Sequence, residues 1–245
     1  LLAYYSQNYA VLLQSKGELD KAQAEYYDAI AITRKVLGDD HSLLGGSQVM
    51  LGRLLHSREQ FGEAEIAFRD ALRVHRNAHG DAHPFVGYDL VSLGMLLHDM
   101  GKLQEAEAAI REGLAVYEKT LGENHQYIAS GLTALCALLN DDDRASDGRA
   151  LIERALEIRR KDYDDAHPLL AATQSVAGRN LAMLGDYAAA EPLLRHSMDV
   201  LQKQDGADSL RLRRTRQWLS DLYVASGQPQ QAERLREPPV AAAKK

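Results

Sequence analysis

The sequence predicts an all-α fold, a right-handed α-α superhelix (solenoid) of about six helix-turn-helix repeats. The prediction depends on a period of forty-two residues, because a fixed period of this length is typical of arrays whose repeats bury their apolar faces against one another. Three columns carry the period: glycines between repeats, histidines three residues later, and small residues within the first helix. The columns are Gly38, Gly80, Gly122, Asp164 and Gly206; His41, His83, His125, His167 and Ser209; and Ala10, Gly52, Gly94, Cys136, Gly178 and Ser220.

The period divides the chain into one continuous array. We expect a single domain over residues 1–236, with repeats at approximately 1–38, 39–80, 81–122, 123–164, 165–206 and 207–236. Residues 237–245 include two prolines that cannot continue a helix, so we expect a frayed tail there. The chain begins inside a repeat without an initiator methionine, and we expect it to be part of a longer array.

The repeat over residues 81–122 shows how each helix is encoded. His83 precedes a proline, which suits the first helical position, and the apolar spacing predicts a first helix over 84–98. Gly101 allows the left-handed conformation of a tight turn. A second helix is expected over 103–121, which completes a helical hairpin.

The columns assign structural duties to individual residues. We expect the histidine column to cap the first helices, since Ser209 at its last position is a strong N-cap residue. Gly94 and Ala106 are expected to face each other where the two helices of a hairpin pass closest. Cys136 is expected to be a small buried filler rather than a nucleophile. Asp143 replaces a turn glycine, and aspartate tolerates a left-handed turn.

Composition excludes several classes of function. The net charge of −6 argues against nucleic acid as a partner, because nucleic-acid-binding proteins present a basic face. No run of apolar residues is long enough to span a membrane, so no membrane partner is expected. A single cysteine gives no disulfide framework and fits a reducing, cytoplasmic location.

The segment from Gly101 to Glu107, Gly-Lys-Leu-Gln-Glu-Ala-Glu, resembles the tetratricopeptide repeat (TPR) in its forty-two-residue variety. That variety occurs in kinesin light chains and many bacterial regulatory proteins, and the resemblance implies a scaffold that binds other proteins. Kinesin light chains carry paired asparagines on the first helices, and of the matching positions only Asn8 keeps asparagine. The last repeat, from Trp218 to Pro229, is similar to the closing repeat of TPR-bearing bacterial serine/threonine kinases.

The first helices of such arrays line a concave groove, and the resemblance places the candidate binding residues there. We expect an extended or helical segment of a partner protein on this surface, which mixes aromatic, methionine and neutral polar groups. The alternative for each residue is packing against the next repeat. The expected groove residues are Tyr4, Gln7, Asn8, Val49, Met50, Arg53, His56, Tyr88, Ser92, Met95, His98, Arg179, Arg214, Gln217 and Trp218.

Two local clusters admit more specific interpretations. His75, His79 and His83 stand four apart, as metal-binding histidines on a helix can, but Gly80 interrupts the helix and no metal site is expected. Four arginines of the last repeat form either a solvated face or a site for an acidic partner at the end of the groove. They are Arg211, Arg213, Arg214 and Arg216.

The usual catalytic motifs are absent from the sequence, so we expect no enzyme activity and no cofactor. The leading hypothesis is a non-catalytic scaffold that binds a peptide or protein segment in the groove. The alternative is an architectural array that self-associates as a homo-oligomer, or that packs against an upstream catalytic or sensor domain.

Overall fold

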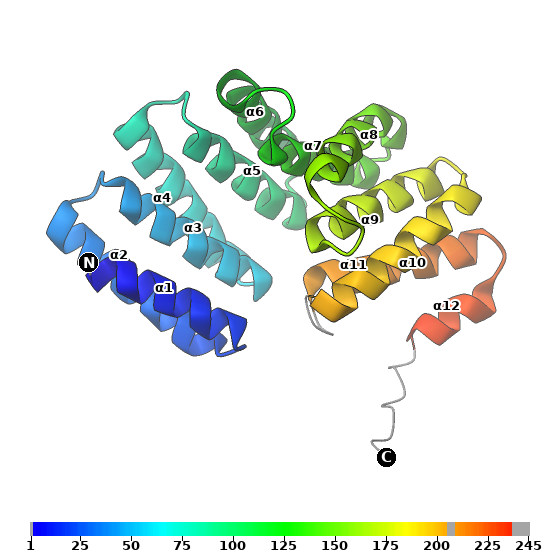
Figure 1. Ribbon diagram of the computed structural model, residues 1–245, viewed down its shortest axis with the longest axis horizontal. Coiled ribbons are helices and arrows are strands. Elements are labelled where there is room, and N and C mark those ends of the chain that lie inside the picture. Colours follow the sequence, from blue (N-terminus) through cyan, green and yellow to red (C-terminus); the bar gives the residue numbers. More distant parts are fainter. Residues whose placement is uncertain (1, 205–208, 237–245) are drawn as a thin grey trace, which may run out of the picture. The chain divides into compact units, whose positions relative to one another are not determined.

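The structure, a computed structural model, describes residues 2–204 and 209–236, and all regular secondary structure within these ranges is α-helical (Figure 1). The expected all-α repeat class is therefore confirmed. Gly206 and the expected tail at 237–245 lie outside the described residues. The helices are α1 (Leu2–Ser15), α2 (Leu19–Leu37), α3 (Ser42–Ser57), α4 (Phe61–His79), α5 (Pro84–Asp99), α6 (Leu103–Leu121), α7 (Gln126–Asp141), α8 (Ala145–Asp162), α9 (Pro168–Met183), α10 (Tyr187–Gln204), α11 (Leu210–Ala225) and α12 (Pro229–Arg236).

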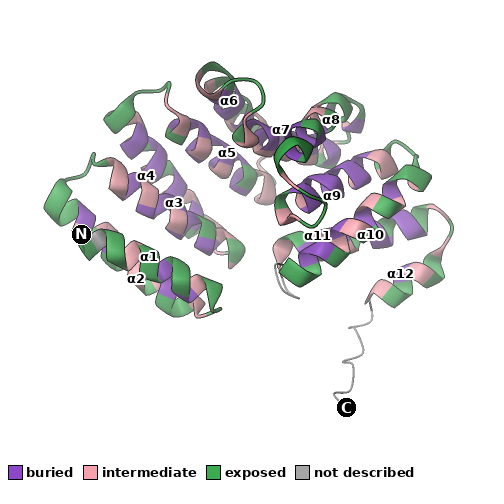
Figure 2. Cartoon of the chain, viewed as in Figure 1, coloured by how far each residue is buried: buried purple, intermediate pink, exposed green. Residues whose placement is uncertain are grey.

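The chain consists of two compact units, residues up to Ala134 and residues from Leu135, and the boundary falls inside α7. In the first unit α1 pairs with α2, α3 with α4 and α5 with α6, while α2 packs on α3 and α4 on α5. In the second unit α9 pairs with α10 and α11 with α12, while α8 packs on α9 and α10 on α11. Figure 2 shows buried residues, in purple, along these helices, so each unit has its core between its own hairpins.

The helix boundaries match the expectations for the third repeat. The first helix, expected over 84–98, is α5, and the second, expected over 103–121, is α6. The turn between them begins with Met100 and uses Gly101 at a φ of 75°. The repeat's local signals therefore determine both helices to within one residue.

The histidine column caps the first helices, as expected. Each imidazole Nδ1 accepts a hydrogen bond from the backbone N–H two residues later, which satisfies one of the unpaired donors of the first turn. Because Nδ1 must be unprotonated to accept this bond, each cap requires a neutral ring. The donors are Leu43, Phe85, Tyr127 and Leu169 for His41, His83, His125 and His167, at 3.1–3.2 Å, and Leu212 for the hydroxyl of Ser209, at 3.2 Å.

The turns inside the hairpins require left-handed backbone at one fixed position. Glycine takes this position in most repeats, but Asp143 has a φ of 54°, which confirms its expected role. Glu59 has a φ of 60° at the same place in its own repeat. A side chain in this conformation costs about 1–2 kcal/mol, which the packing of the two flanking helices must offset.

Close approach of the two helices explains the small-residue column. A Cβ on Gly94 would lie 3.1 Å from the backbone oxygen of Ala106 and 2.5 Å from Cγ1 of Ile110. A Cβ on Gly178 would lie equally close, 3.1 Å, to the oxygen of Ala190, which is the equivalent of Ala106 in a later repeat. The expected proximity of Gly94 and Ala106 is confirmed.

Between α7 and α8 the sizes of the two facing residues are exchanged. Here Cys136 stands in the glycine column of the first helix, and Gly148 stands where other second helices have alanine. A Cβ on Gly148 would lie 3.0 Å from the sulfur of Cys136. Cys136 is fully buried, and burial raises the pKa of its thiol to about 12, which agrees with the expected role as a filler.

A buried polar pair joins α4 to α5. His75 Nδ1 and Asp89 Oδ2 lie 2.6 Å apart, with side-chain exposures of 4% and 0%. The other ring nitrogen, Nε2, carries a hydrogen, because it faces the carbonyl oxygen of Ser42 at 3.2 Å. Burial raises the pKa of Asp89, and the hydrogen bond with His75 opposes this rise. A Cβ on Gly45 would lie 2.6 Å from Nε2, so the glycine makes room for the ring.

The small-residue column predicts opposite effects for two glycine-to-alanine substitutions. Gly94→Ala should lower the free energy of unfolding by about 1–3 kcal/mol, because the helices must separate to admit the methyl group. Gly46→Ala should raise it by about 0.5–1 kcal/mol, because Gly46 is also helical and its Cβ would meet nothing within 4 Å. Urea unfolding measures both values. Shifts of the same sign would contradict the close-approach explanation.

The capping column predicts that His83→Ala lowers the free energy of unfolding near neutral pH by about 1 kcal/mol. His83→Ser should retain most of the stability, since Ser209 performs the same task in the last repeat. Denaturation of the two variants beside the unmodified chain provides the measurement, and equal losses for Ala and Ser would exclude a capping role.

The same cap predicts a pH dependence. Burial, followed by the charges of His79 and His75, lowers the pKa of His83. An imidazole with a lowered folded-state pKa contributes its full stability above the unfolded value of about 6.5, and this contribution is lost as the pH falls through the folded pKa. Between about pH 7 and about pH 5 the unmodified chain should therefore lose more stability than the His83→Ser variant. Parallel pH profiles would refute this account.

Candidate functional site

The expected groove residues separate into two surfaces, one on each compact unit. The α3–α5 surface consists of Arg53, His56, Tyr88, Ser92, Met95 and His98 of the first unit, together with Asp99 and Tyr127. The α9–α11 surface consists of Asp141, Arg179, Gln217 and Trp218 of the second unit. Both surfaces arise because residues three or four apart share one face of a helix, and that face recurs on each first helix.

The expected residues of α1, the first helix that precedes α3, differ in how far they are exposed. Tyr4 is 56% exposed, and Asn8 is also exposed. Gln7 is half-buried and accepts a long hydrogen bond, 3.5 Å, from the hydroxyl of Ser47 on α3. Gln7 therefore connects consecutive first helices, whereas Tyr4 and Asn8 remain accessible.

Arg53 and Tyr88 form the first link within the α3–α5 surface. Arg53 Nη1 donates a hydrogen bond of 2.9 Å to the Tyr88 hydroxyl, which joins α3 to α5. The Tyr88 ring lies 5.7 Å from the ring of Tyr127, centroid to centroid. Tyr127 was not among the predicted site residues. The signal that could have identified it is the large apolar residue two positions after each capping histidine.

His56 and Asp99 form the second link. His56 Nε2 lies 2.6 Å from Asp99 Oδ2, and the two side chains are 15% and 5% exposed. Asp99 was also absent from the prediction, because it ends its helix and the turn residues were interpreted only as a loop. The pair holds the ends of α3 and α5 together.

One apolar side chain of α5 remains exposed on this surface. Met95 is 44% exposed and stands on the same face of α5 as Tyr88 and Asp99. Ser92, His98 and Met50 are half-buried around this face. The α3–α5 surface therefore offers one exposed apolar side chain, Met95. Polar side chains lie around it, and the hydrogen bonds between α3 and α5 hold several of them in place.

Val49 does not belong to this surface. It is 2% exposed and lies in the core with Leu51 and Gly52. The expectation came from the paired-asparagine positions, but in α3, as at the equivalent Val91 of α5, the first position of the pair is buried in the core. The helix turns by about 100° per residue, so Met50 reaches the surface while Val49 does not.

On the α9–α11 surface Arg179 occupies the central position. Its guanidinium forms an ion pair with Asp141, and its Cζ lies 4.9 Å from the centre of the Trp218 ring. Gln217 donates a hydrogen bond of 2.7 Å to Asp221 on the same helix. A cation held between a carboxylate and an indole face is a well-ordered arrangement, since both contacts restrict the same side chain.

The four arginines of α11 do not form one site. Arg211 and Arg214 are three residues apart and share one face of the helix, while Arg213 and Arg216 share the opposite face. In other repeats the positions equivalent to Arg213 and Arg216 are buried or half-buried, and the second helices of those repeats are longer. The second helix here, α12, ends at Arg236. Only Arg214 lies in the column of Tyr4 and Tyr88, so a four-arginine site at the end of the groove does not form.

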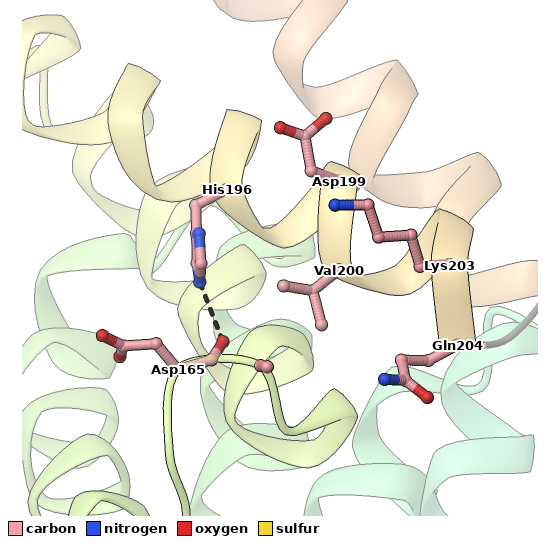
Figure 3. Close-up of a pocket in the computed structure, with 7 residues that line it drawn as sticks. Asp165, His196, Asp199, Val200, Lys203 and Gln204 are labelled. Carbon is pink, nitrogen blue, oxygen red and sulfur yellow. Dashed lines mark hydrogen bonds between the residues drawn. The ribbon is translucent and has the colours of Figure 1, made fainter.

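A cavity of about 330 Å³ lies along α10 of the second unit (Figure 3). None of the predicted groove residues lines it. His196 Nε2 donates a hydrogen bond of 2.9 Å to the backbone oxygen of Asp165, so its ring is engaged. Asp199 and Lys203, four residues apart on α10, are ordinary exposed helix charges. The cavity shows no arrangement suited to catalysis.

Within residues 2–204 and 209–236 the side chains form no cluster of three His, Cys, Asp or Glu suited to a metal ion. The three histidines considered for such a site have other contacts: His75 bonds Asp89, and the rings of His79 and His83 stack at 4.2 Å. In the same part of the chain no helix combines the length and apolar character required to cross a bilayer.

A family model described as the MalT-like TPR region matches residues 1–245, the whole chain. A search of curated protein sequences finds no match. The chain resembles BtubC (BKLC) from P. vanneervenii at 23% identity, covering 81% of this chain and 79% of that one, with a TM-score of 0.65. Kinesin light chain TPR-like repeats from Podosopora anserina align at 21% identity over 82% of this chain and 95% of theirs, with a TM-score of 0.65.

Two Rap structures align over still more of the chain. The apo form of RapI shares 14% identity, covers 96% of this chain and 95% of that one, and has a TM-score of 0.68. A Rap protein complexed with Competence and Sporulation Factor shares 13% identity, covers 95% of this chain and 74% of that one, and has a TM-score of 0.66. At these identities the likeness establishes the fold.

The α9–α11 surface predicts a measurable role for Arg179. Arg179→Ala should lower the free energy of unfolding by about 1–2 kcal/mol and shift the emission of Trp218, the only tryptophan, to longer wavelength, because the indole loses its cover. Arg149→Ala is the matched control, since its pair with Glu153 is exposed and should contribute less than about 0.5 kcal/mol. Unchanged emission in Arg179→Ala would contradict the stacked geometry.

Proposed function

Because this chain belongs to the MalT-like TPR region family, we propose that it is a non-catalytic scaffold that binds a segment of a partner protein on its first helices. The observation that carries the proposal is the α3–α5 surface. Exposed Met95 lies on the same face of α5 as Tyr88, about two turns further along the helix, and Tyr127, which is 41% exposed, contacts the Tyr88 ring. Methionine and tyrosine are enriched where proteins meet, since they bury much area and adapt to irregular shapes.

The surface is arranged before any partner arrives. The Arg53–Tyr88 and His56–Asp99 links fix side chains that would otherwise lose rotamer freedom on binding. A prearranged surface loses less conformational entropy when it binds, which favours affinity without a deep pocket. The partner segment that suits it carries one or two apolar side chains for Met95 and the tyrosines, and polar groups for His98 and Ser92.

The comparison with Rap supports the proposal by analogy. A Rap protein with a TM-score of 0.66 to this chain was solved with Competence and Sporulation Factor bound to it. The same fold therefore supports recognition of a bound factor in that protein. Binding of a cytoplasmic protein or peptide, without a cofactor, is the corresponding role that we propose here.

The proposal predicts that peptides selected on the immobilised chain from a phage-displayed random library bind the α3–α5 surface. The double variant Tyr88→Ala, Met95→Ala should weaken binding of the selected peptides at least about tenfold, as expected for loss of two central contacts. Ile66→Ala is the control, because Ile66 is 66% exposed on a second helix, α4. Titration by fluorescence anisotropy measures the affinities. Equal binding by the double variant and the control would refute the surface assignment.

A further inference from the structure

Two second helices, α2 and α4, expose large apolar residues at positions where the other second helices have none. Tyr27 of α2 is 45% exposed, and its position holds arginine in α4, α6 and α10 and glutamate in α8. Ile66 of α4 is 66% exposed, and its position holds alanine, proline or arginine in the other second helices. One exposed apolar side chain needs no explanation, but these two line the same cavity.

The cavity has a volume of about 260 Å³ and is bounded by α2, α3 and α4 of the first unit. We name it the α2–α4 groove and define it by Tyr27, Gln48, Glu63, Ile66 and Asp70, which all line it. Leu51 and Leu55 of α3 line it as well, and they are 4% and 1% exposed, so the groove reaches the apolar core. It shares no residue with the α3–α5 surface.

Two carboxylates of α4 line the groove without a cation to neutralise them. Glu63 accepts a long hydrogen bond of 3.3 Å from the Tyr27 hydroxyl, and Asp70 accepts one of 3.4 Å from Nε2 of Gln48. Neither carboxylate forms an ion pair with any residue in the described part of the chain. Arg34 also lines the groove, but its guanidinium is already paired with Asp39, at 2.9 Å.

The next groove along the chain, between α4 and α6, shows how equivalent carboxylates are satisfied. There Glu105 pairs with Arg69 at 3.5 Å, and Glu112 pairs with Arg76 at 2.6 Å. The equivalent positions of the α2–α4 groove are, in the same order, Glu63, Tyr27, Asp70 and Arg34. The tyrosine cannot form an ion pair, and the aspartate is shorter than glutamate by one methylene group. The α2–α4 groove therefore lacks both of the ion pairs that cross the next one.

A buried amide adds another polar group without a partner. Gln48 is 3% exposed, and its Nε2 faces the Asp70 carboxylate, which can only accept. Its Oε1 accepts no hydrogen bond from the described residues. Gln174 of the second unit has the same position and also an Oε1 without a partner, but glutamate and proline replace Tyr27 and Ile66 there. An unpartnered amide between apolar walls thus distinguishes the α2–α4 groove.

We propose that the α2–α4 groove binds a basic amphipathic helix of a partner protein. Glu63, Ile66 and Asp70 share one face of α4, and the two carboxylates are about 10.5 Å apart along its axis. The partner helix carries Lys or Arg at two positions seven residues apart, and a leucine-sized side chain between them. The two cations meet the carboxylates, while the apolar side chain enters the groove between Tyr27 and Ile66.

The spacing favours a helix over an extended segment. A strand places the side chains of one face at intervals of about 6.8 Å, which does not match two carboxylates about 10.5 Å apart. The charge of the partner follows from the groove, because two unpaired carboxylates attract cations and repel an acidic segment. The net charge of −6 on the whole chain acts in the same direction.

Titration of a fluorescein-labelled peptide, followed by anisotropy, tests the proposal. An alanine-based peptide of about fifteen residues with the central sequence Lys-Ala-Ala-Leu-Leu-Ala-Ala-Lys presents the required pattern in either direction. It should bind the unmodified chain with an affinity that falls as the salt concentration rises. The same peptide with glutamate in place of both lysines should bind at least about tenfold more weakly.

Tyr27→Arg is a variant that restores the residue of the next groove. The introduced arginine should pair with Glu63, as Arg69 pairs with Glu105, and so lower the affinity for the lysine peptide at least about tenfold. Ile66→Ala changes no charge and should weaken binding about three- to tenfold, because the apolar contact is reduced.

The double variant Glu63→Gln, Asp70→Asn removes both carboxylates and should weaken binding about five- to tenfold, with a smaller salt dependence. Glu153→Gln, Glu157→Gln is the matched control, since it removes two exposed carboxylates of α8 and changes the net charge equally. The control should bind within about twofold of the unmodified chain. Circular dichroism verifies that every variant is folded.

Three outcomes would overturn the proposal. They are no binding of the lysine peptide at about 1 mM, equal affinity for the glutamate peptide, and unchanged binding by both Tyr27→Arg and Ile66→Ala. Tyr88→Ala, Met95→Ala should leave the affinity for the lysine peptide unchanged, because neither residue lines the groove. Failure of this proposal is therefore distinguishable from failure of the proposed function, which that double variant tests.

Discussion

The close approach of the two helices within each hairpin is the constraint on which the rest of the structure depends. A small residue allows the backbones to meet: glycine in three repeats, and alanine, serine or cysteine in the others, with Cys136 opposite Gly148. A large side chain from the second helix then fills the space above each of the three glycines: Phe68 over Gly52, Ile110 over Gly94 and Leu194 over Gly178. The spacing of each hairpin follows from this contact. So does the rotation of each first helix, which decides which of its residues reach the surface.

That rotation creates the candidate binding surface. Once α3 and α5 are set by their own hairpins, Arg53 meets Tyr88 and His56 meets Asp99 across the boundary between repeats. These two links join neighbouring repeats, and they also order the surface on which we propose that a partner binds. They hold side chains in place next to Met95 without burying it, so the array presents an ordered surface with little further loss of entropy on binding.

The fold could be predicted in detail because the same capping, turn and small residues recur in each repeat, so that each helix boundary is supported by several equivalent positions. One capping histidine is weak information, whereas five equivalent positions define a helix start, and the predicted ends of α5 and α6 were correct to one residue. The candidate site was less predictable, because its contacts join side chains of different repeats that share no column. Asp99 acquires its role only from His56, its neighbour in space, and the column that contains Tyr127 does not reveal its contact with Tyr88. Val49 was assigned to the surface from a family resemblance, which does not specify which face of α3 points to the solvent.

The pair of His75 and Asp89 has a consequence for how the array assembles. Repeats with similar faces can in principle pack in the wrong order, with one hairpin skipped. If α2 packed on α5 in place of α4, Asp89 would meet Thr33, the equivalent of His75, and its buried carboxyl would lose its ring partner. If α4 skipped to α7, His75 would face Gly131. Either mispairing strands a polar group in the interior at a cost of several kcal/mol, on the order of 3–5 kcal/mol for a buried charge. This unrepeated pair thus favours the packing of α4 on α5 over either mispairing.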